Sequence, residues 1–416
     1  MRPVVLGLAA AVASLIAPTI GVGVASAQSM RFSFGGGPTP QGSRRVEADD
    51  LYNPSRGYGF EPSSGQAGSA SFSVAVPEGD YRVRLILAKD APDGVVVRAE
   101  ARRLMLERAT GDDAFVVNVR TPALTPPPAN APGVSAVRLK VREAMSRTWD
   151  DRLTLEISGD PAAILSVAVE PVTVPRLILL GDSTVADQIG EPVTSWGQML
   201  PRFLDEGVSV ANHAESGETL KSFLVSSRLD KALSQIRLGD VVMIQFGHND
   251  QKTQWPQTYV DAASTYPAYL HAYVAEIRRR GGTPVLVTST QRRTFGPDGH
   301  IVNSHGDYPA AVVRAGHETG APVIDLSALS TRFYEALGPE GSAAAFATPQ
   351  DLTHHSAYGA YGLARAAAEA LSRLDTPVAG HLLTDLPAFD IDAPPSPDQF
   401  DVAPSASRAD VAPSGS

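Results

Sequence analysis

Residues 177–184 read Leu177-Ile178-Leu179-Leu180-Gly181-Asp182-Ser183-Thr184, a compact apolar run that ends in a glycine and polar side chains. A run that is apolar at every position predicts a strand buried on both faces, because a half-buried strand would alternate apolar and polar residues. Such strands occur where helices cover both sides of a parallel sheet. The stretch therefore predicts an α/β fold with Ser183 at the carboxyl end of a strand. In parallel α/β sheets, the residues that bind ligands and catalyse reactions lie at this end of the strands.

Strand and helix patterns alternate from this stretch toward the carboxyl terminus. Short apolar runs predict four further strands, at residues 208–211, 241–245, 284–288 and 322–325. Helical patterns lie between and after them, at residues 197–206, 220–238, 266–280, 308–319 and 357–374. We therefore expect residues 173–376 to form a doubly wound α/β domain with a five-stranded parallel sheet.

The two regions that flank this domain have a different composition. Six short runs between residues 30 and 172 often alternate apolar with polar side chains and are separated by turns rich in Gly, Pro and Asp. Because no helical pattern interrupts them, they predict an antiparallel β-sandwich over residues 28–172. Residues 377–416 are rich in Pro, Ala, Ser and Asp, which predicts a disordered tail.

We expect residues 1–27 to be an export signal. Arg2 opens the stretch, an apolar run follows, and Ala25-Ser26-Ala27 supplies the small residues of a cleavage site. A membrane anchor is the alternative, although Pro18 and several glycines interrupt the run. With the signal removed, we expect a secreted or periplasmic monomer that makes no membrane contact.

The overall charge and the absence of cysteine exclude several functions. The 45 acidic residues outnumber the 35 basic ones, and no cluster of Lys and Arg provides the basic face that a nucleic-acid partner requires. The chain of 416 residues contains no cysteine, so it has no disulfide, no cysteine nucleophile and no cysteine-ligated zinc.

Three places put a polar residue or a glycine just after a predicted strand. Ser183 suits a nucleophile whose own N–H helps to bind an oxyanion, or it caps the next segment. Asn249 offers an amide donor to a developing negative charge, or it stabilises an ordinary turn. Gly217 allows a ligand to approach the backbone closely, or it is a plain loop glycine.

A fourth place lies just before the last predicted helix, at Asp351-Leu352-Thr353-His354-His355. If this turn is already helical, Asp351 and His354 lie on one face, because residues three apart are neighbours there. His354 would then act as a general base that Asp351 orients. The spacing leaves open that His355 is the base, that the cluster binds a metal, or that Asp351 only caps the helix.

These four blocks, in this order, resemble the SGNH hydrolases, or GDSL-type esterases, and in particular the branch similar to rhamnogalacturonan acetylesterases. The family-like stretches within residues 176–374 are Gly181-Asp182-Ser183-Thr184, Phe246-Gly247-His248-Asn249-Asp250, Gln291-Arg292-Arg293, Ile301-Val302-Asn303-Ser304, Gly306-Asp307-Tyr308-Pro309 and Asp351-Leu352-Thr353-His354. The resemblance implies that Ser183 is the nucleophile, His354 the base and Asp351 its partner. It further implies an oxyanion hole made by the amides of Ser183 and Gly217 and the side chain of Asn249, with no metal or organic cofactor.

The amino-terminal region carries a second, less specific resemblance. Phe32-Ser33-Phe34-Gly35 and Tyr58-Gly59-Phe60-Glu61 are similar to a galactose-binding-like β-sandwich that accompanies some of these esterases. One departure concerns the substrate, since Glu218 follows Gly217 where a basic or neutral residue is common in the family.

The function that we expect is that of a secreted serine esterase which removes acetyl groups from a plant cell-wall polysaccharide, pectin of the rhamnogalacturonan type. The candidate substrate contacts are Asp182, His248, Trp255 and Arg292. One alternative is a lipase or thioesterase of broad acyl-ester specificity, which would need an apolar acyl groove. The other is a carbohydrate-binding protein with an inactive hydrolase domain.

Overall fold

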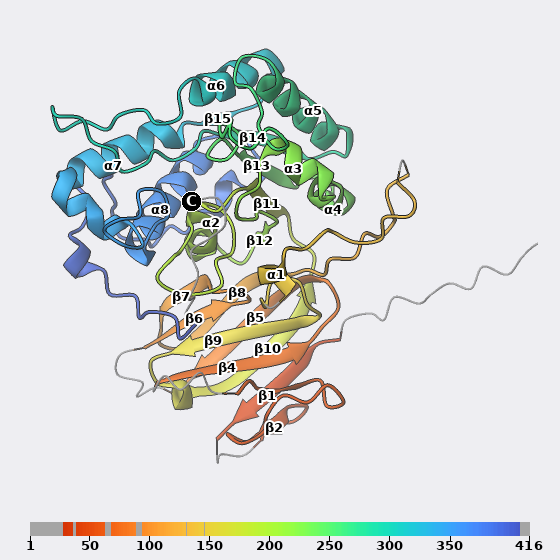
Figure 1. Cartoon of the computed structure of the whole chain (residues 1–416). Helices are drawn as coiled ribbons and strands as arrows, with labels where there is room; N and C mark the ends of the chain where they lie inside the picture. The colour runs from red at the N-terminus through yellow and green to blue at the C-terminus, as the bar shows by residue number, and fades with distance from the viewer. Residues whose placement is uncertain are drawn as a thin grey trace, which may run out of the picture.

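The structure is a computed structural model that describes residues 28–35, 39–62, 68–88, 94–129, 131–144 and 146–407. The predicted export signal and residues 408–416 of the predicted tail lie outside the described residues. Figure 1 shows a parallel sheet wrapped by helices in one half of the molecule and the sheets of the amino-terminal region in the other half. In the described part of the chain, no helix is both long and apolar enough to cross a bilayer.

The parallel sheet contains the five strands that the sequence predicts. Its strand order is β12-β11-β13-β14-β15, and every neighbouring pair is parallel. The strands are β11 (Arg176–Gly181), β12 (Ser209–Asn212), β13 (Val241–Gln245), β14 (Thr283–Val287) and β15 (Val323–Ile324). The α/β fold with a five-stranded parallel sheet is thereby confirmed, and the carboxyl ends of β11 and β13 lie side by side.

Alternate residues of the sheet enter two different hydrophobic cores. Leu177 and Leu179 of β11 pack into one core, and Ile178 and Leu180 pack into the other, because successive side chains of a strand point to opposite faces. Helices contribute to the first core from α2 (Trp196–Met199), α7 (Leu326–Gly341) and α8 (Ala357–Ser372), and to the second from α3 (Leu220–Val225), α4 (Arg228–Gln235), α5 (Thr265–Arg279) and α6 (Tyr308–Thr319). The sheet is therefore covered on both faces.

The helices differ from the sequence prediction in three places. The expected helix over 220–238 is two helices, since Ser227 between α3 and α4 has a left-handed backbone with φ of 59°. The expected helix over 197–206 consists of α2 and the 3₁₀ turn η2 (Leu200–Phe203), which contains Pro201 near its start. The sequence prediction also missed α7. The backbone of this helix is not helical at Gly338, and the next residue is Pro339.

The amino-terminal region forms two sheets of five strands each, with the orders β2-β1-β10-β5-β8 and β3-β4-β9-β6-β7. The strands are β1 (Met30–Phe34), β2 (Arg44–Val46), β3 (Tyr58–Phe60), β4 (Ser69–Ala75), β5 (Gly79–Leu87), β6 (Val95–Ala99), β7 (Arg103–Ala109), β8 (Asp112–Val119), β9 (Arg152–Ser158) and β10 (Ile164–Val172). Both sheets contribute to one hydrophobic core. The pairing of β1 with β2 is parallel, so the region is not purely antiparallel as predicted, and a galactose-binding-like sandwich remains a prediction.

Buried ion pairs join the two halves of the molecule. Arg103 of β7 donates to the carboxylate of Asp187 at 2.8 Å, and both side chains are almost fully buried. The same carboxylate accepts a hydrogen bond from Asn212 at the end of β12 at 2.8 Å. Leu104 of β7 also packs into the core beneath α2 and α8. The amino-terminal sheets therefore support the segment that follows Ser183.

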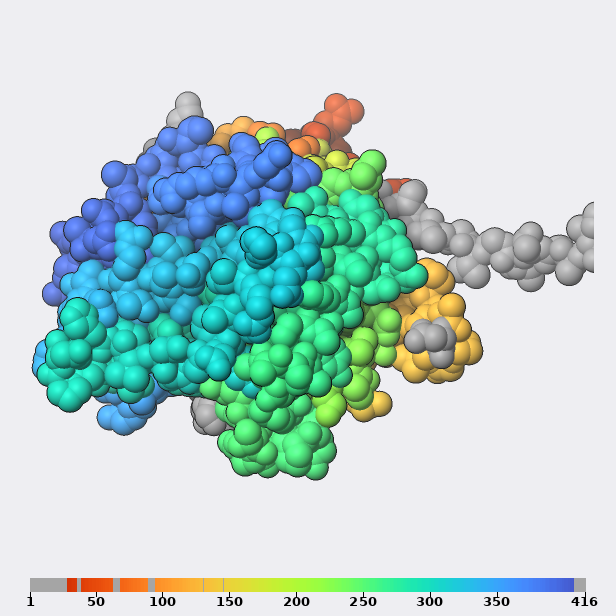
Figure 2. Space-filling view, turned by 90° about the horizontal axis from the view of Figure 1, so that it is seen from above, coloured from red at the N-terminus to blue at the C-terminus, as the bar shows by residue number. Residues whose placement is uncertain are grey.

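Residues 377–407 differ from the prediction of a disordered tail. The segment contains the 3₁₀ turns η4 (Ala379–His381) and η5 (Pro397–Gln399), and its Phe400 ring lies 5.4 Å from the Tyr361 ring of α8. Ser405 is fully buried and donates to Glu156 of β9 at 2.9 Å. Figure 2 shows these blue carboxyl-terminal residues as part of the surface of the helical half. The polar composition concealed a few well-spaced apolar side chains that pack on α8.

Candidate active site

Ser183 lies in a tight turn at the carboxyl end of β11. The turn is closed by the Asp182 carbonyl, which accepts hydrogen bonds from the amides of Val185 at 3.1 Å and Ala186 at 2.9 Å. Gly181 is required before it, because an added Cβ would come within 2.9 Å of the Gln245 carbonyl on β13. The sheet therefore fixes the backbone at Ser183, and this residue is 3% exposed.

Ser183, His354 and Asp351 form one hydrogen-bonded relay. His354 Nε2 lies 3.0 Å from Ser183 Oγ, and His354 Nδ1 lies 3.0 Å from Asp351 Oδ2. The other oxygen of Asp351 accepts the backbone N–H groups of Thr353 and His354, each at 2.8 Å. The aspartate thus closes the turn before α8 and also orients the imidazole toward Ser183.

The neighbouring His355 faces away from this relay. Its Nε2 lies 2.6 Å from the Tyr334 hydroxyl, and its ring packs beside Phe346 in the core. Burial lowers the pKa of His355 to about 3, and the charge of nearby His354 contributes to the decrease. The spacing in the sequence left open whether His354 or His355 is the base, and in the structure His354 is the one that contacts Ser183. Because the two rings diverge, His354, His355 and Asp351 do not converge as metal ligands, and the described residues contain no group of three or more such side chains that could hold a metal ion.

The carboxylate of Asp351 is kept ionised by its surroundings. Burial opposes its charge, but the hydrogen bond to His354, the charge of that ring and two backbone N–H donors outweigh burial and lower the Asp351 pKa to about 2. A folded-state pKa below the unfolded value near 4 stabilises the fold above about pH 4, and this stabilisation is lost as the pH falls toward 2.

We therefore expect the Asp351→Asn variant to be less stable than the parent protein at pH 6, by about 1 kcal/mol, since the carboxylate is partly solvated. The difference should shrink as the pH falls from about 4 toward 2, because the parent protein then loses the same charge. Urea unfolding of both proteins at several pH values measures it. A difference that stays constant over this range would contradict the assigned pKa.

The three predicted oxyanion donors lie on neighbouring loops. Gly217 has a left-handed backbone with φ of 77°, which suits glycine, and it follows β12 by a few residues. The Asn249 side-chain nitrogen donates to the carbonyl of Glu218, the residue after Gly217, at 3.1 Å. The side chain of Gln188 connects this loop to the serine, since its Nε2 donates to the Ser183 carbonyl at 2.6 Å and to Ser216 Oγ at 3.2 Å. The sequence prediction missed Gln188, which lies in an irregular segment without a distinguishing pattern.

Asp182 and His248, which the sequence offers as substrate contacts, form a buried pair next to Ser183, and their contact with substrate stays a prediction. Asp182 is fully buried, and its carboxylate accepts from the Thr184 amide at 3.0 Å and lies 3.3 Å from His248 Nδ1. Burial opposes the charge of Asp182, but His248 and the Thr184 donors outweigh it and lower its pKa. Burial also lowers the pKa of His248, although the neighbouring Asp182 opposes this decrease. The two side chains are therefore held in a buried hydrogen-bonded pair beside the turn of Ser183.

Arg292 and Trp255 lie in loops of the same half of the molecule. Arg292 is partly buried and donates to the His248 carbonyl and to Thr353 Oγ1, each at 3.3 Å, so it lies against the turn that carries His354. Trp255 is 44% exposed, with the Lys252 ammonium 5.0 Å from its ring. The structure thus links Arg292 to the turn that carries His354 and gives Trp255 an exposed position.

Comparison with known proteins identifies the family. Residues 179–360 match the GDSL-like lipase/acylhydrolase family. The chain is 38% identical over 223 residues to rhamnogalacturonan acetylesterase RhgT of Bacillus subtilis strain 168. This alignment covers 50% of this chain and 94% of that protein. It is 31% identical over 215 residues to the probable rhamnogalacturonan acetylesterase YesY of the same bacterium, covering 50% of this chain and 98% of that protein.

A solved structure aligns over a longer part of the chain. The crystal structure of protein YxiM from Bacillus subtilis aligns with a TM-score of 0.48 and 24% identity, covering 83% of this chain and 98% of that one. The family assignment rests on the sequence match to RhgT, which extends over nearly the whole length of that relative. The chain therefore belongs to the GDSL-like lipase/acylhydrolase family, also called the SGNH hydrolases, and is an esterase.

Proposed function

We propose that this protein removes acetyl esters from pectin of the rhamnogalacturonan type through an acyl-enzyme formed on Ser183. The observation that carries the proposal is the relay from Asp351 through His354 to Ser183 Oγ, with both hydrogen-bond distances at 3.0 Å. A serine hydroxyl is a weak nucleophile until a neighbouring base removes its proton, and this arrangement supplies that base.

The proposed reaction has two halves. In the first half, His354 takes the Ser183 proton while Oγ attacks the acetyl carbonyl, and the oxyanion is held by the amides of Ser183 and Gly217 and by Asn249. The protonated His354 then gives its proton to the sugar oxygen as the ester bond breaks, so that the sugar leaves with a free hydroxyl. In the second half, His354 takes a proton from a water molecule as that water attacks the acetyl-enzyme, and it returns the proton to Ser183 Oγ as the acetyl–oxygen bond breaks and acetate is released. Asp351 stabilises the imidazolium in both halves.

The acetyl group and the pectin backbone are proposed from two supports. The relatives RhgT and YesY bear the names of a rhamnogalacturonan acetylesterase and a probable one. The second support is Arg292, since a guanidinium beside the His354 turn would attract the carboxylates of a uronate-containing polymer.

Changing Arg292 to methionine is expected to lower kcat/KM for acetylated pectin by about tenfold, because a charge-assisted contact to a uronate is lost. Hydrolysis of neutral p-nitrophenyl acetate should change by less than about threefold, since that ester has no carboxylate for Arg292 to bind. Steady-state kinetics on both substrates at low and high salt measures the difference.

The matched control for this prediction is Arg278→Met. The Arg278 guanidinium donates to the carbonyls of Thr319 and Gly320 at the end of α6, so its removal subtracts the same charge from another part of the chain. Equal losses on pectin and on p-nitrophenyl acetate for the Arg292 variant would contradict a role in recognising uronates.

The experiment that tests the whole proposal is acetate release from acetylated rhamnogalacturonan, acetylated xylan and p-nitrophenyl esters of increasing chain length. We expect the highest kcat/KM on the pectin and a steep decrease for acyl chains longer than acetyl. Preference for long acyl chains would instead indicate a lipase or thioesterase. Absence of hydrolysis from the folded protein would indicate a binding protein with an inactive domain.

We further propose that residues 1–27 direct export to the periplasm or the medium, where an acetylated polysaccharide is accessible. The pattern of Arg2, an apolar run and Ala25-Ser26-Ala27 supports this location. We also propose that residues 28–172 are a galactose-binding-like sandwich, which the two five-stranded sheets around one core support, and that the protein acts as a monomer.

A further inference from the structure

The loop that carries Gly217 is held by residues from the amino-terminal half of the chain. We propose that Lys140 and Arg142 are positioning residues that direct the Gly217 amide toward the reacting carbonyl. This inference rests on the proposed function, because it concerns the oxyanion site of that reaction. If Lys140 and Arg142 have this role, the amino-terminal region contributes to the geometry of the oxyanion site as well as forming two sheets of its own.

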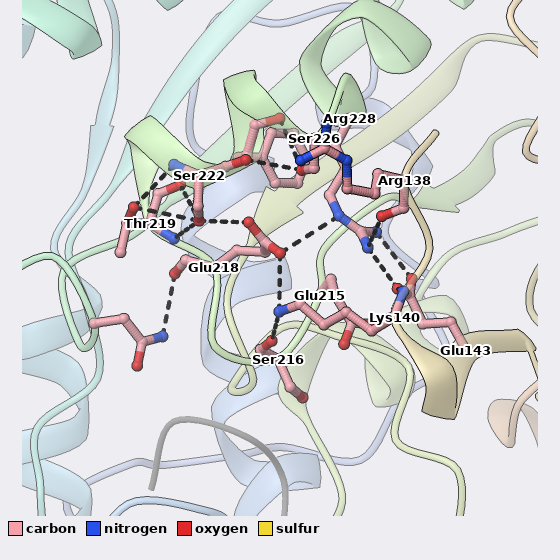
Figure 3. A network of polar contacts seen from close by, with 12 residues as sticks. Arg138, Lys140, Glu143, Glu215, Ser216, Glu218, Thr219, Ser222, Ser226 and Arg228 are labelled. Carbon is pink, nitrogen blue, oxygen red and sulfur yellow. Dashed lines mark hydrogen bonds and ion pairs between the residues drawn. The ribbon is translucent and has the colours of Figure 1, made fainter. Parts of the chain in front are cut away.

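Lys140 contacts the residues on both sides of Gly217. Its ammonium donates to the carbonyl of Ser216 and forms an ion pair with Glu218 Oε1 at 2.9 Å. Figure 3 shows this ammonium between the two partners. A single side chain from before the first parallel strand thus holds both neighbours of the glycine.

The contact with the Ser216 carbonyl acts on the Gly217 amide directly. The Ser216 carbonyl and the Gly217 N–H belong to the same peptide unit, which is planar and trans, so the two groups point in opposite directions. Fixing the carbonyl by a cation therefore fixes the direction of the N–H. The positive charge also polarises that peptide unit, which strengthens the hydrogen bond that the N–H can donate.

Arg142 holds the preceding residues of the same loop. Its Nε donates to Glu215 Oε1 at 2.7 Å, and its Nη2 donates to Ser216 Oγ at 2.9 Å. Ser216 Oγ also accepts a hydrogen bond from the side-chain amide of Gln188, which donates to the Ser183 carbonyl as well. The loop is therefore tied to the amino-terminal region on one side and to the backbone of Ser183 on the other.

The segment that carries Lys140 and Arg142 is itself anchored by a buried ion pair. It includes the short helix α1 (Val141–Ala144), in which Glu143 accepts from Arg228 of α4 at 2.9 Å and from the Trp149 indole at 2.8 Å. Arg228 is fully buried, and Glu143 is 3% exposed. The acidic side chains of Glu143, Glu215 and Glu218 thus face the basic side chains of Lys140, Arg142 and Arg228 in one network.

A purely structural role for these cations would be to stabilise the junction between the two halves of the molecule. An ion pair at that junction between residues outside the Gly217 loop provides a comparison. Arg82 of β5, for example, forms an ion pair with Glu206 at 2.9 Å. If Lys140 acts only on the junction, its loss should resemble the loss of Arg82.

The test compares Lys140→Met, Lys140→Arg and Arg82→Met by steady-state hydrolysis of p-nitrophenyl acetate. We expect Lys140→Met to lower kcat by about 10- to 100-fold with KM within about twofold, because a displaced oxyanion donor weakens transition-state binding alone. Lys140→Arg should restore most of the rate, and Arg82→Met should keep it. Arg142→Met provides a second variant, with a smaller expected loss of kcat, if Lys140→Met does not fold.

A second measurement does not depend on activity. Hydrogen–deuterium exchange of the peptide that covers residues 213–220 should be faster in folded Lys140→Met than in Arg82→Met. Unchanged kcat in Lys140→Met, while Ser183→Ala is inactive, would overturn this inference and leave the proposed function intact. Full activity of Ser183→Ala would instead overturn the proposed function itself.

Discussion

Ser183→Ala is expected to lower kcat for p-nitrophenyl acetate and for acetylated pectin by about 10⁵- to 10⁶-fold, because the acyl-enzyme can no longer form. The residual rate over water would come from the oxyanion donors and from substrate binding, which the substitution leaves in place. Ser183 Oγ bonds to His354, and its removal takes away only one small polar atom from a buried turn. The melting temperature should therefore change little, and thermal unfolding together with single-turnover kinetics measures both outcomes.

Ser73→Ala is the matched control for the loss of a buried serine hydroxyl. Ser73 of β4 is fully buried, and its hydroxyl lies 2.8 Å from that of Thr154, far in sequence from the relay. We expect this variant to lose stability and keep its kcat. A Ser183→Ala protein that is folded and retains more than about a tenth of the parent rate would remove Ser183 as the nucleophile.

His354→Ala and His355→Gln are expected to have opposite effects, although the two residues are adjacent in the sequence. His354→Ala should lower kcat by about 10⁴- to 10⁶-fold, because Ser183 loses the base that takes its proton. His355→Gln should keep kcat within about tenfold and lower stability by about 1–3 kcal/mol, because the Tyr334 hydroxyl loses its buried ring partner.

The comparison is made by kinetics and urea unfolding on the two variants side by side. His355 contributes through the core formed with Tyr334 and Phe346, whereas His354 contributes through its 3.0 Å contact with Ser183. A large loss of kcat in a stable His355→Gln protein, with activity retained in His354→Ala, would reverse the assignment of the base.

The positions of the five parallel strands could be predicted from the sequence because burial is visible locally. The run at 177–180 is apolar throughout, and the structure places its alternate residues in two cores on opposite faces of the sheet. The break at Ser227 and the helix α7 could not be read in this way. A left-handed residue between two helical turns, and a helix interrupted by Gly338, leave no periodic signal that separates them from a longer helix or a loop.

Part of the candidate site could likewise be predicted from the sequence, and the rest depended on the tertiary structure. Residue types at strand ends indicated Ser183, Asn249 and Gly217, and a spacing of three indicated Asp351 with His354. The choice between His354 and His355 required coordinates, since it depends on which ring meets Ser183 across 171 positions of sequence. The burial of Asp182 and the packing of residues 377–407 likewise depend on neighbours from distant segments.

The sequence alone was sufficient for the α/β class, the five parallel strands and the candidates for the relay, with His354 and His355 both open, because these depend on patterns within a few consecutive positions. The tertiary structure was needed to show that Lys140 and Arg142 hold the Gly217 loop, 73 to 76 positions away. Ion pairs depend on distance in space, and a charged residue in a turn-rich segment has the same local pattern whether it faces solvent or a buried carboxylate.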